Sequence, residues 1–113
     1  MALSKSITLP NGISGNYIRV ADSFELNRRQ GIVTAHVALF ADEAHAATLP
    51  NYPLAVIGLV ELSGEKFTQY LGRDAVAAAS GNIVGQLYLA AKVETVRALG
   101  PLTELSLSDA LDV

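Results

Sequence analysis

Hydrophobic positions in this chain follow a period of two as far as Gly64 and a helical period after it. The alternation predicts strands over residues 4–9, 17–26, 32–40 and 54–62. Later apolar residues recur at helical spacing. The pattern therefore predicts an α+β fold, in which an antiparallel sheet of about four strands packs against one main C-terminal helix and a short helix that precedes it.

The alternation also assigns side chains to the two faces of the sheet. Within residues 17–26, Ile18 and Val20 share one parity, whereas Tyr17 and Arg19 share the other. An aromatic residue beside an arginine is typical of protein interfaces, so Tyr17 and Arg19 are candidate contact residues. A cross-strand packing pair explains them equally well. In the following strand the residues expected in the core are Val33, Ala35, Val37 and Leu39.

Residues 54–62 differ from the other strands because both faces are apolar. Val56 falls on one face, and Ile57 and Leu59 fall at odd positions on the other. Such a strand is central in a sandwich, lies under a helix, or presents its second face to another subunit. The last alternative makes Ile57 and Leu59 candidate partner-contact residues. The preceding residues 41–53 contain two prolines and are expected to form a long connection.

Two helices are expected in the second half of the chain. A short one follows Gly64, where the period changes. The main helix is expected over residues 83–99, with Asn82 placed to cap its N-terminus. Gly100 and Pro101 are typical residues for ending it.

The remaining residues indicate a single α+β domain over residues 1–99 and a C-terminal arm over residues 100–113. The arm interleaves large aliphatic residues with polar ones, and such residues near a free terminus indicate docking. It docks either on this domain or on a neighbouring subunit. In the second case its candidate contact residues are Leu105, Leu107 and Leu111.

Composition excludes several classes of protein. The chain has 113 residues, enough for one domain with its own core. It contains no apolar run near the roughly 18 residues of a membrane span, and its start lacks the features of a signal peptide, so synthesis in a cytoplasm is expected. The absence of cysteine excludes disulfides and thiolate metal sites. A net charge of -3 argues against nucleic-acid binding.

Catalytic motifs are absent from the sequence. The two histidines, His36 and His45, fall on different predicted elements and match neither strand nor helix metal-binding spacing. No serine lies in a G-x-S-x-G motif. Asp42, Glu43 and His45 cluster in one connection, where a solvated loop is a simpler explanation than acid–base chemistry. We therefore expect a protein that is not an enzyme and has no cofactor or metal.

The first twenty residues, MALSKSITLPNGISGNYIRV, carry a family resemblance. A short strand, an Asn11-Gly12 turn and an Asn16-Tyr17-x-Arg19 segment open the chain. This opening resembles the N-terminus of small tail-associated virion structural proteins of tailed bacteriophages and prophages, of the baseplate or fibre-attachment type. A weaker similarity lies in the helix that carries Tyr88-Leu89 and Lys92, and in the final DALDV.

The resemblance implies a non-enzymatic structural component of a bacteriophage virion, in the tail, the baseplate or the tail-fibre attachment region. Such a protein is made in the host cytoplasm and becomes part of the virion. Its partners are other tail proteins and copies of itself, in a homo-oligomer or hetero-complex, with no nucleic acid or membrane. The alternative is a small-ligand-binding module with a pocket between sheet and helix, for which Asn16, His36 and Tyr88 are the candidate polar residues.

Overall fold

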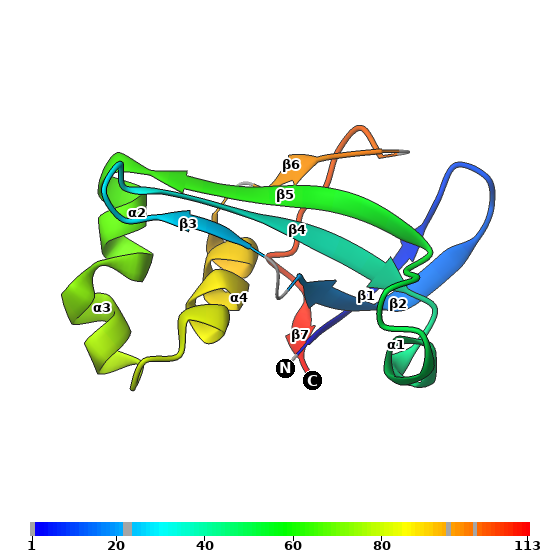
Figure 1. The fold of residues 1–113 in the computed structure, drawn as a ribbon. Coiled ribbons are helices and arrows are strands. Elements are labelled where there is room, and N and C mark those ends of the chain that lie inside the picture. The colour runs from blue at the N-terminus through cyan, green and yellow to red at the C-terminus, as the bar shows by residue number, and fades with distance from the viewer. Residues whose placement is uncertain (1, 22–23, 95, 101) are drawn as a thin grey trace.

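The computed structural model describes residues 2–21, 24–94, 96–100 and 102–113. Within them the chain forms an antiparallel sheet with helices packed against it (Figure 1). The strands are β1 (Leu3–Thr8), β2 (Ser14–Val20), β3 (Glu25–Asn27), β4 (Ile32–Phe40), β5 (Ala55–Ser63), β6 (Arg97–Ala98) and β7 (Leu111–Asp112). The helices are α1 (Glu43–Thr48), α2 (Gly64–Leu71), α3 (Arg73–Ala78) and α4 (Ile83–Val93).

The predicted α+β class is confirmed, but the expected strand number was too low. Across the described ranges the sheet has 7 strands. The additional ones are β3, β6 and β7, which are 3, 2 and 2 residues long. Strands this short carry no alternation of their own and form because a longer neighbour offers its backbone for pairing.

The strand order is β6-β5-β4-β2-β1-β7, and all pairs are antiparallel. β2 pairs with the second half of β4, and β3 pairs with its first half. The strand predicted over residues 17–26 is therefore two strands that follow one another along β4. Of that range, Asp22 and Ser23 lie outside the described residues.

The turn between β1 and β2 forms at Asn11-Gly12, as predicted. The Leu9 N–H donates to the Ile13 carbonyl at 2.7 Å, and the Gly12 N–H donates to the Leu9 carbonyl at 2.9 Å. The Asn11 side chain accepts the Ile13 N–H at 3.0 Å. Gly12 has φ +86°, which glycine adopts without steric cost. Turn geometry therefore accounts for both Asn11 and Gly12.

The core lies between one face of the sheet and helices α2 and α4. α2 contributes Phe67 and Leu71, and α4 contributes Leu87 and Tyr88, all buried. The side chains predicted for the core face of β4 are fully buried, which confirms their assignment: Val33, Ala35, Val37 and Leu39.

β5 contains a β-bulge that changes which face its residues occupy. Val56 and Gly58 pair with consecutive residues of β4, so Ile57 between them is the extra residue. Ile57 is buried in the core, whereas Val56 is 40% exposed on the opposite face. The prediction that Ile57 shares a face with Leu59, and Val56 does not, is therefore wrong. A strict period of two fails wherever a bulge inserts one residue.

The main helix is shorter than the predicted range of residues 83–99. It ends at Val93 because Glu94 adopts an extended backbone, with φ −91° and ψ 165°, and the chain then pairs with β5 as β6. Of the residues used in that prediction, Thr95 and Pro101 lie outside the described part of the chain.

The connection predicted over residues 41–53 contains a helix, α1. The Asp42 side chain accepts the backbone N–H of His45 at 2.8 Å and so caps the helix N-terminus. The helix ends at Leu49, whose N–H donates to the His45 carbonyl at 2.8 Å. A single capped helical turn is too short to show as a periodic apolar pattern.

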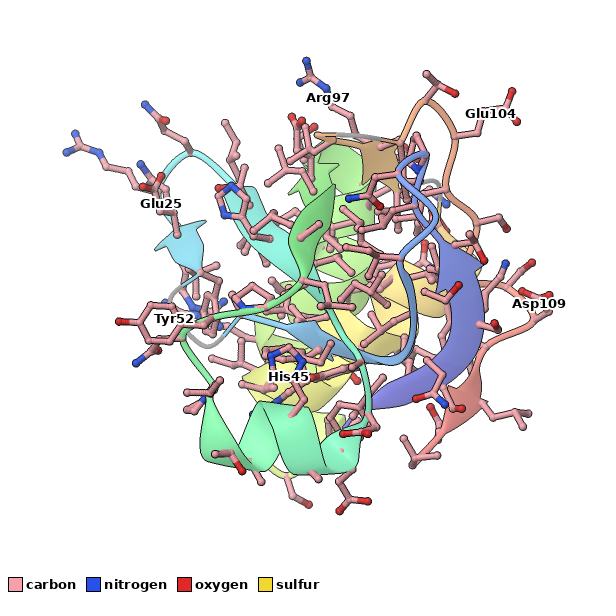
Figure 2. The ribbon with its side chains drawn as sticks, turned by 90° about the vertical axis from the view of Figure 1, so that its right-hand side faces the viewer. Glu25, His45, Tyr52, Arg97, Glu104 and Asp109 are labelled. Carbon is pink, nitrogen blue, oxygen red and sulfur yellow. The ribbon has the colours of Figure 1, made fainter. Side chains whose placement is uncertain are left out.

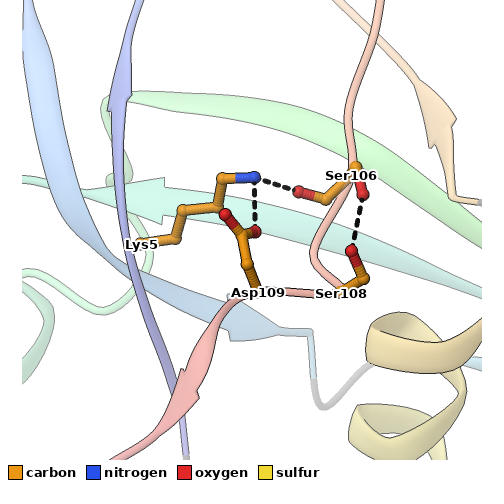
Figure 3. Close-up of polar contacts among 4 residues, drawn as sticks. All are labelled: Lys5, Ser106, Ser108 and Asp109. Carbon is orange, nitrogen blue, oxygen red and sulfur yellow. Dashed lines mark hydrogen bonds and ion pairs between the residues drawn. The ribbon is translucent and has the colours of Figure 1, made fainter.

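In the structure the C-terminal arm docks on the chain's own domain. β7 pairs with β1, and both Leu107 and Ala110 are buried in the core. Lys5 on β1 forms an ion pair with Asp109 at 2.8 Å and donates to the Ser106 carbonyl (Figure 3). The hydrogen bond from Lys5 lowers the pKa of the Asp109 carboxyl. The two chain ends consequently lie side by side (Figure 1).

Candidate protein-interaction surface

The sheet face opposite α2 and α4 carries most of the predicted contact residues. We call it the outer sheet face; its larger side chains, together with Ala38, come from β2, β4, β5 and β7. They are Tyr17, Arg19, His36, Ala38, Val56, Leu59 and Leu111. The predicted contact residues among them are Tyr17, Arg19, Leu59 and Leu111, which are far apart in sequence and share this face.

Cross-strand register arranges these side chains in rows, because residues opposite one another in an antiparallel pair point to the same face. The opposed sets are Leu111 with Ser4 and Tyr17, then Arg19 with Ala38 and Val56, then His36 with Leu59. The rows follow one another along the strands, so the face is continuous from β7 to β5.

The outer sheet face includes exposed apolar side chains. Leu111 is 69% exposed and Val56 is 40% exposed, and His36 is exposed on the same face. Tyr17 and Arg19 are half-buried, so each keeps part of its side chain in contact with solvent. Large aliphatic, aromatic and arginine side chains together are the composition that protein interfaces favour.

A shallow hollow marks one end of the outer sheet face. It has a volume of about 250 Å³, and its walls include Arg19, Ala38 and Phe40 from the sheet and Pro50 and Asn51 from the connection after α1. Phe40 lines the hollow although it is only 2% exposed. The hollow is small for a drug-sized ligand, which ordinarily occupies about 300–1,000 Å³. Its size suits a single side chain of a partner protein.

The other predicted contact residues lie on the core side of the sheet. Ile57 and Leu107 are fully buried within the chain, and Leu105 is half-buried against the core. Leu105 packs over β5 at Gly58, where an added Cβ would lie 2.7 Å from Leu105 Cδ2. In the described chain, contacts within the domain already account for these three aliphatic side chains.

Sequence reasoning missed Val56 as a member of the outer sheet face. The bulge at Ile57 reverses the face of Val56, and Ala38 is the register partner of Val56. The one sequence signal of this bulge was Gly58, because a glycine inside a strand pattern often marks a bulge.

The cluster of Asp42, Glu43 and His45 has a structural role in the connection after β4. Asp42 caps α1, and the His45 ring contacts the Phe40 ring edge-on at a centroid distance of 5.3 Å. Both ring nitrogens of His45 lie within hydrogen-bond distance of backbone groups. Asp42 and His45 therefore hold this connection together through contacts with its backbone.

The polar residues suggested for a ligand pocket between sheet and helix lie apart. The Tyr88 hydroxyl is buried and accepts the Val20 N–H at 2.9 Å. His36 is exposed on the outer sheet face, on the other side of the sheet. Asn16 is exposed near the end of β4, where its N–H donates to the Ala41 carbonyl at 3.2 Å. These positions do not form the convergent polar lining of a binding pocket.

A polar network joins α2 to Glu94, which follows the end of α4. Lys66 lies 2.6 Å from the Glu94 carboxylate, and the Tyr70 hydroxyl donates to the same carboxylate at 3.2 Å. The hydrogen bond from Lys66 lowers the pKa of Glu94, and the same contact raises the pKa of Lys66. Burial, followed by the Glu94 charge, raises the pKa of Tyr70. These groups hold two helices together on the core side of the sheet.

Within the described ranges, no group of three or more His, Cys, Asp or Glu side chains could hold a metal ion. No helix of the same ranges has the length and apolar character needed to cross a membrane. Comparisons of the chain with protein-family models, curated proteins and solved structures find no match. Its function is therefore inferred from the outer sheet face and from the sequence resemblance.

Proposed function

We propose that this protein is a non-enzymatic structural component of a bacteriophage virion, acting through protein–protein contacts in the tail, the baseplate or the tail-fibre attachment region. The observation that carries the proposal is the outer sheet face. It presents exposed Val56 and Leu111 beside Tyr17 and Arg19 on a continuous sheet. Covering such a surface with a partner removes apolar area from water.

The resemblance at the start of the chain supports the same conclusion. The Asn11-Gly12 turn ends the first strand of the hairpin, and the segment that follows carries Tyr17 and Arg19 onto the outer sheet face. The residues that resemble small virion proteins thus include two residues of the candidate contact surface.

Strand addition at a sheet edge is a second route to a partner contact. β6 pairs with β5 only at Gly58 and Leu59, and β7 pairs with β1 only at Leu3 and Ser4. Among the described residues, the rest of β5 and β1 has no strand on that side, which is the kind of edge that an added strand pairs with. The partners that we propose are other virion tail proteins and copies of this chain.

Membership in the virion is tested by purifying phage particles from a lysate of cells that carry this gene and analysing them by mass spectrometry. The proposal predicts that the chain remains with the tails through a density gradient, at a constant ratio to the major tail protein. Immunogold labelling then places it at the tail or baseplate. A chain found only in the unsedimented fraction, with intact particles lacking it, would contradict the proposal.

A further inference from the structure

His45 joins the two ends of the connection between β4 and β5. Its Nδ1 accepts the backbone N–H of Ala41 at 3.0 Å. Its Nε2 lies 3.0 Å from the carbonyl oxygen of Tyr52. Figure 2 shows the ring inside the bend formed by α1 and the following connection, while the Tyr52 side chain points outward. One imidazole therefore holds residues on both sides of α1.

These two contacts require one protonation state of the ring. A carbonyl oxygen only accepts hydrogen bonds, so Nε2 must carry a proton to bond to Tyr52. The Ala41 N–H only donates, so Nδ1 must have a free lone pair. The closed connection consequently needs neutral His45 in its Nε2–H tautomer.

We propose that His45 is a pH-sensitive latch, which closes the connection over Phe40 when neutral and releases it when protonated. A proton on Nδ1 replaces the lone pair that accepts the Ala41 N–H, so two N–H groups would face each other. The direction follows from this geometry. The latch holds at neutral and alkaline pH and weakens as the pH falls through the range in which imidazole takes up a proton.

The charged groups near the ring do not change the direction of release. Asp42 and Glu43 lie on the same helical turn, and Asp42 already accepts the backbone N–H of His45. Arg19 of β2 lines the hollow beside Phe40. In the described part of the chain, no carboxylate hydrogen-bonds to the ring itself. Whatever these charges contribute, a protonated Nδ1 has no lone pair left to accept the hydrogen bond from the Ala41 N–H.

Release would alter the outer sheet face because Phe40 lies directly beneath the latch. The centroids of the Phe40 and His45 rings lie 5.3 Å apart. Phe40 is also the register partner of Tyr17. Opening the connection would therefore expose the Phe40 side chain next to Tyr17 on the outer sheet face. Only this consequence for partner binding rests on the proposed function. The latch itself is inferred from the two hydrogen bonds of the His45 ring.

The test is NMR of the free, full-length protein, which needs no partner. Long-range ¹H–¹⁵N spectra at about pH 8 are expected to show His45 as the Nε2–H tautomer. Exchange protection of the Ala41 amide, corrected for the intrinsic rate, is then followed to about pH 5 while the ring resonances report protonation. We expect protection to fall about tenfold as His45 titrates, the effect of losing one hydrogen bond.

His36 provides the matched control, because it is exposed on the outer sheet face and its side chain forms no hydrogen bond among the described residues. His36→Gln should keep the pH response of the Ala41 amide. His45→Phe should show weak protection at every pH while the amides of β4 and β5 stay protected. A Nδ1–H tautomer at neutral pH, a ring that stays neutral over the whole range, or unchanged Ala41 protection as His45 titrates would each overturn the proposal. The pH dependence of Ala41 protection in the wild-type protein tests the latch even if His45→Phe does not fold.

Discussion

The phenol oxygen of Tyr88 accepts the backbone N–H of Val20 at 2.9 Å, deep in the core. Tyr88 comes from α4 and Val20 is the last residue of β2, so this bond ties the main helix to the point where the strand pairing along β4 is interrupted. On the side of β2 away from β4, β1 pairs with β2 only as far as Ile18, opposite Leu3, so Val20 lies beyond the end of that pairing in the described chain. A helix side chain thus satisfies backbone at a break between two strands.

Tyr88→Phe removes the acceptor and leaves the Val20 N–H buried without it. We expect a loss of about 1–3 kcal/mol in the free energy of unfolding, the usual cost of a buried group without a partner. Urea denaturation measures it. Tyr52→Phe is the control, since the Tyr52 side chain is 71% exposed and should change stability little. Equal stability of the two variants would show that the Tyr88 hydroxyl does not hold α4 to β2.

Gly58→Ala tests the docking of the C-terminal arm over β5. The added methyl would lie 2.7 Å from Leu105 Cδ2 and 2.8 Å from Val96 Cγ1, closer than carbon atoms pack. We expect a loss of about 1–3 kcal/mol from overpacking. Leu105→Ala on its own removes a half-buried side chain, and together with Gly58→Ala it should cost less than the sum of the two single changes. Strict additivity in urea denaturation would place Leu105 away from Gly58.

Acidification should destabilise the protein through Glu94 and Asp109. The pKa of each carboxyl is lowered in the folded chain, by Lys66 and Lys5 respectively. A carboxyl with a lowered pKa contributes stability above its unfolded value and loses that contribution as the pH falls through its folded value. The urea midpoint should therefore decrease below about pH 4.5, the ordinary value for Glu94.

Single variants separate this effect from general acid unfolding. Glu94→Gln should give a lower midpoint at neutral pH and a shallower decline on acidification. Glu104→Gln is the control, because Glu104 is exposed and forms no ion pair among the described residues. A decline of the same steepness in Glu94→Gln and in wild type would show that the Lys66 contact contributes nothing measurable.

Local alternation predicted the long strands and the fold class because each of those strands has one face in a core. β4 was predicted at its observed bounds, Ile32–Phe40, since its apolar positions alternate without a break. The short strands were missed for the opposite reason. β7 consists of two exposed residues, Leu111 and Asp112, and pairs only because the arm returns to β1.

The candidate surface was predictable in part. Parity placed Tyr17 and Arg19 on the outer face from sequence alone, and the structure agrees. Val56 could not be assigned, because one inserted residue at Ile57 reverses the alternation and only long-range pairing reveals it. Whether the C-terminal leucines dock on their own domain also depends on contacts between residues far apart in sequence.

The outer sheet face as a contact surface is tested most directly by sedimentation velocity. Leu111→Asp and Arg19→Glu each alter this face, and Val93→Asp is the matched control, since Val93 is 62% exposed on α4 beneath the other face. Wild type and Val93→Asp are predicted to sediment as an oligomer, or together with the tail proteins encoded beside this gene. Leu111→Asp and Arg19→Glu should sediment as folded monomers that leave those proteins free. A wild-type chain that remains monomeric and ignores its neighbouring tail proteins, or outer-face variants that assemble like wild type, would contradict the account.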